Sequence, residues 1–206
     1  MANQARFGFW PVQSQYRFQT RKYTVATAQT FANGQLGLAP GEPVAPVSDG
    51  TILPYQVGGT RILGVVASVV YKDSTGVKVY GGYLPTAYAY TGAQSILNPN
   101  APIIEVFDDP NIEFIAEFAT SAGTVADFNT IFGNMECSAT SATSVDTIFK
   151  RSLRTLTGSE AVTATLPFRV LEVLRSPSQD FAATSNLRVK CMMNASVHPF
   201  TNTTGI

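Results

Sequence analysis

The side chains that perform nucleophilic or acid–base catalysis are few in this sequence. The chain has one histidine, His198, in a segment rich in Asn, Thr and Pro, and two cysteines, Cys137 and Cys191. A nucleophile needs a base beside it, and neither cysteine lies in a motif typical of a catalytic thiol. These three side chains are too few for a structural zinc site with four ligands. The sequence therefore predicts no catalytic residue, no metal site and no enzymatic activity.

Acidic and glycine-rich segments offer only weak alternatives to this prediction. Four acids could bind calcium: Glu105, Asp108, Asp109 and Glu113. Their spacing is not that of an EF-hand loop, and Asp-Asp-Pro-Asn is typical of a turn. A carboxylate pair for glycoside hydrolysis stays open, although no surrounding signature supports it. The pairs Gly58-Gly59 and Gly81-Gly82 match no phosphate-binding loop, so we expect no cofactor.

The first 28 residues combine aromatic and basic side chains, and the first acid of the chain is Glu42. The side chains concerned are Arg6, Phe7, Phe9, Trp10, Tyr16, Arg17, Phe18, Arg21, Lys22 and Tyr23. One interpretation is an ordinary first strand whose aromatic residues fill the core. The other is an extended arm on another subunit, since Arg and aromatic residues are enriched where interfaces are energetically strong. We expect the arm, and we take these ten residues as its binding residues.

Composition limits the classes of partner. The 206 residues hold 14 Lys+Arg and 14 Asp+Glu, so the chain is no polycation and we expect no nucleic-acid partner. Charged residues make 14% of the chain, against roughly 25% in an average soluble protein. No apolar run approaches the roughly 20 residues of a membrane helix, and the start lacks the apolar core of a signal peptide. We therefore expect a protein that stays in the cytoplasm where it is made, with both cysteines buried and reduced.

Short apolar runs between turn residues indicate an all-β fold. The run 61–71 is rich in β-branched residues, and after the turn 72–76 the run 77–80 returns as a partner strand. Residues 103–118 predict two strands around the turn 108–111. The segment 166–174 predicts a strand interrupted near Leu171, and 187–192 predicts a half-buried strand with a period of two. One segment, 124–132, has apolar residues at helical spacing and predicts one or two helical turns.

These elements predict an extended arm over residues 1–28, a small β-barrel-like part over 29–95 and a β-sandwich-like part over 96–206. The last two parts could also form one continuous domain. Charge is segregated along the chain: between Val79 and Phe149 there are eight acids and no Lys or Arg, whereas both ends carry basic residues. Such a pattern permits complementary contacts between neighbouring copies in an assembly.

Several segments taken in order resemble the head decoration, or cement, proteins of tailed bacteriophages. They are RFGFWPV, RKYTV, GEPVAPVSDGTI, ILGVVASVV, LPFRVLEVLRSPSQD and NLRVKCMMNASVHPF. The resemblance implies a non-enzymatic, mostly β protein on the outer surface of the virion capsid, where it stabilises contacts between capsomers. It implies the major capsid protein as a partner, and a homo-oligomer in which a trimer is favoured and a dimer is possible.

Other functions compete with this one. A carbohydrate- or receptor-binding β module on the virion would use a platform of tyrosines, namely Tyr55, Tyr71, Tyr80, Tyr83, Tyr88 and Tyr90. A hydrolase with carboxylate catalysis is a third possibility. A major capsid subunit is disfavoured, because the chain is short for one and the expected long helix is missing.

Overall fold

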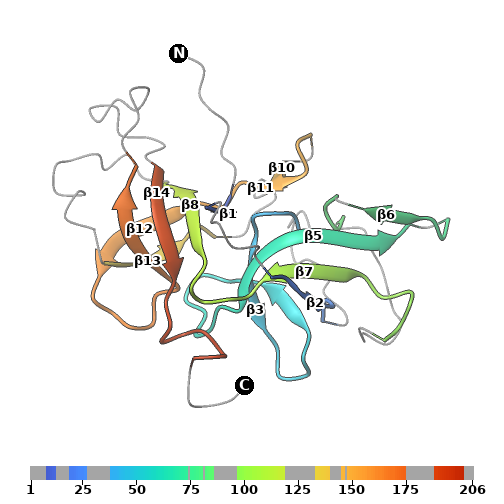
Figure 1. Ribbon diagram of the computed structural model, residues 1–206, viewed down its shortest axis with the longest axis horizontal. Helices are drawn as coiled ribbons and strands as arrows, with labels where there is room; N and C mark the ends of the chain where they lie inside the picture. The colour runs from blue at the N-terminus through green and yellow to red at the C-terminus, as the bar shows by residue number, and fades with distance from the viewer. Residues whose placement is uncertain are drawn as a thin grey trace.

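The computed structural model describes residues 8–12, 19–26, 38–73, 75–80, 82–85, 97–118, 133–139, 145–146, 148–174 and 188–201. In this part of the chain all regular secondary structure is β-strand, which confirms the predicted all-β class (Figure 1). The strands form two six-stranded sheets and a separate two-stranded ribbon. The predicted helix at 124–132 lies outside the described residues.

Sheet I is built from β2 to β7, in the spatial order β2-β7-β5-β3-β4, with β6 paired to β5. Its strands are β2 (Arg21–Tyr23), β3 (Pro43–Pro46), β4 (Ile52–Pro54), β5 (Gly64–Lys72), β6 (Lys78–Tyr80) and β7 (Ile103–Phe107). The β5–β6 pair is the hairpin predicted from 61–80. Its turn is fixed by the Asp73 carboxylate, which accepts hydrogen bonds from the backbone N–H groups of Thr75 and Val77.

The edges of sheet I approach each other. The N–H of Ile52 in β4 donates to the carbonyl of Thr24 (2.9 Å), and the N–H of Ala26 donates to the carbonyl of Ile52 (3.2 Å). This contact is an isolated parallel bridge, so the sheet is strongly curled without a continuous closing ladder. The curled sheet encloses its own apolar cluster, formed by Val25, Leu38, Val44, Ile52, Leu63, Val66, Val69, Leu84, Ile104 and Val106.

Sheet II contains mainly strands from the second half, in the order β1-β8-β14-β13-β9-β12. Its strands are β1 (Trp10–Pro11), β8 (Glu113–Glu117), β9 (Asn134–Cys137), β12 (Leu156–Ala161), β13 (Phe168–Val173) and β14 (Arg188–Met193). In β14 alternate side chains are buried, as the period of two predicted. In β13 the pairing register shifts between Val170 and Glu172, so the predicted interruption at Leu171 is a β-bulge.

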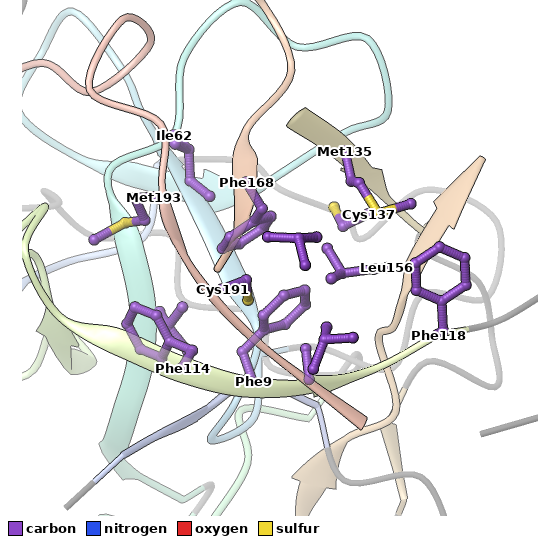
Figure 2. Packing of buried hydrophobic residues seen from close by; sticks show 14 of the residues in the cluster. Phe9, Ile62, Phe114, Phe118, Met135, Cys137, Leu156, Phe168, Cys191 and Met193 are labelled. Carbon is purple, nitrogen blue, oxygen red and sulfur yellow. The ribbon is translucent and has the colours of Figure 1, made fainter. Parts of the chain in front are cut away.

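Aromatic and aliphatic side chains form a second apolar cluster under sheet II (Figure 2). Phe9 stacks on Phe168 with ring centroids 4.3 Å apart, and both rings are almost completely buried. Tyr55, Ile62 and Val65, which come from the sheet I half of the chain, belong to the same cluster. The two sheets therefore share a core.

The chain passes from sheet I to sheet II at the turn 108–111. The two strands predicted around this turn are present as β7 and β8, but they lie in different sheets and do not pair with each other. The boundary expected between residues 95 and 96 thus differs from the division between the sheets, because β7 belongs to sheet I. Amphipathic strands beside a turn look the same in sequence whether they form a hairpin or separate to cover two cores.

The N-terminal segment does not leave the body in the way expected of an arm. β1 pairs with β8 at the edge of sheet II, and β2 pairs with β7 at the edge of sheet I. The physical reason is Phe9, whose ring is buried with the core of sheet II instead of being available to another subunit. This placement holds for residues 8–12 and 19–26, the parts of 1–28 that the structure describes.

Candidate interaction site

The predicted binding residues are divided between the core and the surface. Phe9 is buried, whereas the side chain of Trp10 is 41% exposed at the open edge of β1. Gly8 has a φ of 72°, and a Cβ there would lie 2.8 Å from the carbonyl oxygen of Gly41. Only glycine fits this close approach, so the chain is held tightly where it enters β1.

The basic residues of β2 lie on the surface, where Arg21 and Lys22 are exposed and Tyr23 is half-buried. The other predicted binding residues lie outside the described part of the chain: Arg6, Phe7, Tyr16, Arg17 and Phe18. Their role in binding a partner stays a prediction.

Arg21 and Tyr23 both contact Asp108, which follows β7. Arg21 Nη1 lies 3.2 Å from Asp108 Oδ2, and the Tyr23 hydroxyl donates to the same oxygen at 2.6 Å. Partial burial and this hydrogen bond raise the pKa of Tyr23, so the phenol stays protonated and donates. The guanidinium of Arg21 also lies 4.6 Å from the ring centroid of Phe200, which is 52% exposed.

His198 completes this group, which we call the surface cluster (Arg21, Tyr23, Asp108, His198 and Phe200). The imidazole is buried, with Nε2 2.8 Å from the carbonyl oxygen of Leu63, and it meets Phe200 edge to face. Burial lowers the pKa of His198, although the Leu63 carbonyl and Asp108 oppose this shift. A neutral ring that donates its Nε2 proton to Leu63 therefore fits this position, and it ties the segment after β14 to sheet I.

A second group, the buried cluster (Glu42, Tyr55, Cys137, Ser152 and Arg154), lies between the sheets and was not predicted from the sequence. Arg154 Nη1 is 2.8 Å from Glu42 Oε1, and both side chains are completely enclosed. Ser152 Oγ donates to the other Glu42 oxygen at 2.6 Å. Arg154 also donates from both terminal nitrogens to the carbonyl of Tyr55, at 3.1 Å each, and from Nη2 to Cys137 Sγ at 2.8 Å.

The buried cluster holds an ion pair and a neutral thiol. Burial raises the pKa of Glu42, while Arg154 and Ser152 oppose the shift. Arginine stays protonated in proteins, so the pair is charged as long as Glu42 is ionised. Burial also raises the pKa of Cys137 to about 12, which leaves a thiol that accepts the Arg154 hydrogen bond and is no nucleophile.

Sequence patterns gave little signal for the buried cluster. Glu42 is the first acid of the chain, and Arg154 lies in a short basic segment of the kind that is typical of a protein surface. Neither feature predicts that Glu42 and Arg154, which are 112 positions apart, form an ion pair.

Acidic residues of the middle segment are mostly engaged within the chain. Arg188 Nε lies 3.6 Å from Glu117 Oε1, and Arg21 pairs with Asp108. The Asp109 carboxylate accepts from the backbone N–H of Asn111, which is the turn chemistry expected there. The basic ends thus meet the acidic middle inside one molecule, so this charge pattern does not require a neighbouring copy.

The four described tyrosines of the alternative platform differ in exposure, and Tyr71 on β5 and Tyr83 are half-buried. Tyr55 is completely buried, and Tyr83 is covered by Lys150, whose Nζ lies 4.3 Å from the ring centroid. Tyr80 is 69% exposed on β6. Tyr88 and Tyr90 lie outside the described residues.

A last surface feature is the tip of the ribbon formed by β10 (Val145–Asp146) and β11 (Arg151–Ser152). Ile148 and Phe149 at this tip are 81% and 64% exposed. Such exposed apolar side chains at a turn mark a candidate contact surface.

The fold and these contacts define an all-β protein of two sheets joined by a shared core and a buried ion pair. Comparison with family models, curated proteins and solved structures finds no match. Among the described residues, no group of three or more His, Cys, Asp or Glu side chains could hold a metal ion. In the same part of the chain, no helix has the length and apolar character needed to cross a membrane.

Proposed function

We propose that this protein is a non-enzymatic capsid decoration, or cement, protein that binds the outer surface of a bacteriophage head and stabilises contacts between capsomers. The order of segments that resembles this family is the starting point. The structural observation that supports this proposal best is that the histidine and both cysteines are engaged in the packing and hydrogen bonding of the fold. His198 bonds the backbone of Leu63, Cys137 accepts from Arg154, and Cys191 is completely buried in the core.

A cement protein must hold its contact surfaces at a fixed separation while the shell is under pressure. The shared core and the buried Glu42–Arg154 pair give the two sheets one interior, which suits that task. The neutral chain suits dense packing as well, because many copies side by side do not accumulate repulsion. In this proposal the partners are the major capsid protein and further copies of the chain, as a trimer or a dimer.

The test is co-expression with the major capsid protein of the phage head that the chain is proposed to coat, followed by gradient sedimentation of the assembled shells. We expect the protein to sediment with mature shells at a saturable ratio and to raise the temperature at which the shells open. Unassembled capsid subunits serve as the control and should not retain it. Mature shells that bind none of the protein would contradict the proposal.

A further inference from the structure

The tip of the β10–β11 ribbon, which we call the hairpin tip (Ile148, Phe149, Lys150 and Arg151), presents two apolar side chains beside two cations. The ribbon belongs to neither six-stranded sheet and projects from the body in Figure 1. Ile148 is 81% and Phe149 is 64% exposed, so the described residues leave both side chains largely uncovered.

Hydrogen bonds from within the chain tie the described residues of the hairpin tip to β10. Asp146 Oδ1 accepts from the backbone N–H groups of Ile148 (2.9 Å) and Phe149 (3.0 Å). The base of the ribbon is fixed by Ser152, which donates to the buried Glu42. Hydrogen bonds that order a turn before it binds lower the conformational entropy lost on binding, and this favours tight association.

Both cations of the hairpin tip lie over aromatic rings. Lys150 Nζ is 4.3 Å from the ring centroid of Tyr83, and the Arg151 guanidinium is 4.9 Å from that of Phe149. Neither cation forms an ion pair with a described residue. The Asp146 carboxylate, opposite Arg151 in the ribbon, accepts backbone hydrogen bonds of the turn, so Lys150 and Arg151 leave a net positive charge that a carboxylate-bearing partner would complement.

We propose that the hairpin tip is an anchor that inserts Ile148 and Phe149 into an apolar pocket bordered by carboxylates on the capsid protein. This inference rests on the proposed function, and it assigns the contact to the ribbon. Most acids among the described residues of this chain already bond to its own groups, so a second copy fits less well as the occupant. These acids are Glu42, Asp49, Asp73, Glu105, Asp108, Asp109, Glu117, Glu136, Asp146 and Glu172.

A lipid surface also fits less well than a protein pocket. Even a whole myristoyl chain gives only marginal membrane binding, and two side chains supply less apolar surface. A protein interface of ordinary size buries about 800 Å² on each partner, of which a few central residues supply most of the affinity. Phe149 and Arg151 of the hairpin tip belong to the residue types that are enriched at such centres.

The experiment compares three purified variants with the unaltered protein in titrations of mature capsid shells. We expect Ile148→Ser/Phe149→Ser to bind roughly 30-fold more weakly, the effect of losing about 2 kcal/mol at an interface centre. Lys150→Glu/Arg151→Glu should also bind more weakly, with binding that depends less steeply on salt. Val162→Ser is the matched control, because Val162 is fully exposed elsewhere and should bind as the unaltered protein does. Melting temperatures should agree among all four proteins.

The outcomes separate this inference from the proposed function. If the unaltered protein coats shells and Ile148→Ser/Phe149→Ser coats them equally well, the anchor is wrong and the function stands. If the unaltered protein coats no shells, both are wrong. Light scattering could instead show that the unaltered protein is an oligomer and that only Ile148→Ser/Phe149→Ser dissociates. The hairpin tip would then contact a second copy of the chain. If the unaltered protein binds phosphatidylserine vesicles and only Ile148→Ser/Phe149→Ser loses this binding, the hairpin tip contacts a membrane. Either result overturns the capsid pocket.

Discussion

Two ion pairs lie where the sheets of this protein meet, and their surroundings are opposite. Glu42–Arg154 in the buried cluster is enclosed completely, with a separation of 2.8 Å. Arg21–Asp108 in the surface cluster spans 3.2 Å, and the Arg21 side chain is 61% exposed. Water can take the place of Arg21 in the exposed pair, although the Asp108 side chain is only 5% exposed, whereas water reaches neither partner in the buried pair. Burial should therefore make loss of a single partner far more damaging in the buried cluster.

The largest expected effect comes from breaking the buried pair. Arg154→Met leaves the Glu42 carboxylate buried without its cation, and this type of change costs about 3–5 kcal/mol of unfolding free energy. Urea denaturation followed by tryptophan fluorescence measures the loss. Arg169→Met is the matched control, since Arg169 is an exposed arginine of β13 and should cost far less. The double change Glu42→Leu/Arg154→Met removes both charges and should recover much of the stability, which would show that the unpaired charge causes the damage.

A comparably large effect is expected at Phe9, which packs beside the buried cluster. Phe9→Ala removes a ring that stacks on Phe168 and should cost about 3–5 kcal/mol. The neighbouring Trp10→Ala is the control and should cost less than about 1 kcal/mol, because Trp10 lies at an exposed edge. Trp10 is the single tryptophan of the chain, so urea denaturation is followed here by circular dichroism. Deletion of residues 1–12 should destabilise the body for the same reason. A deletion variant as stable as the full chain would show that these residues do form a separable arm.

An intermediate effect is expected from pH, through the surface cluster. The folded-state pKa of His198 is lowered, so in the window below its unfolded pKa of about 6.5 the unfolded chain binds more protons than the folded one. The stability from the neutral ring is present above this pKa and is lost as the pH falls, by at most about 1.4 kcal/mol per pH unit. Denaturant titrations between pH 7.5 and 5 should show this loss, and His198→Gln should remove that part of the slope. The Leu63 carbonyl, Asp108 and Asp109 oppose this lowering of the His198 pKa.

The smallest effect is expected at the exposed pair. Arg21→Ala should change the unfolding free energy by about 0–1 kcal/mol, and the difference should shrink at high salt. Tyr23→Phe removes the hydroxyl that donates to Asp108 and should cost about 1 kcal/mol, with little dependence on salt. Denaturation in low and high salt distinguishes the two changes. If Arg21→Ala proved as damaging as Arg154→Met, the contrast between the two clusters would be wrong.

Local patterns were sufficient to predict β5, β6, β7, β8, β13 and β14. The β5–β6 hairpin, the alternation in β14 and the bulge in β13 follow from β-branched runs, turn residues and a period of two. Each of these signals depends on residues close together in the chain. The pairing partners of β7 and β8 have no such signal, because the competing arrangements bury the same alternating residues.

The candidate sites were less accessible to sequence reasoning. The basic and aromatic residues near the N-terminus were visible as a group, yet their spacing could not show that Phe9 is buried while Trp10 and Arg21 are exposed. The hairpin tip has no pattern of its own, since Ile148-Phe149 resembles any short apolar run. Exposure depends on what the rest of the chain covers.

The sequence by itself determined the all-β class, the strands with clear alternation and the scarcity of groups for catalysis, because these depend on composition and on neighbours along the chain. The tertiary structure alone decided that β1 lies in sheet II, that Glu42 meets Arg154 across 112 residues, and that Asp108 receives Arg21 and Tyr23. These contacts form only when distant segments enclose a common core. Their energies depend on how much water that core excludes, which no local pattern records.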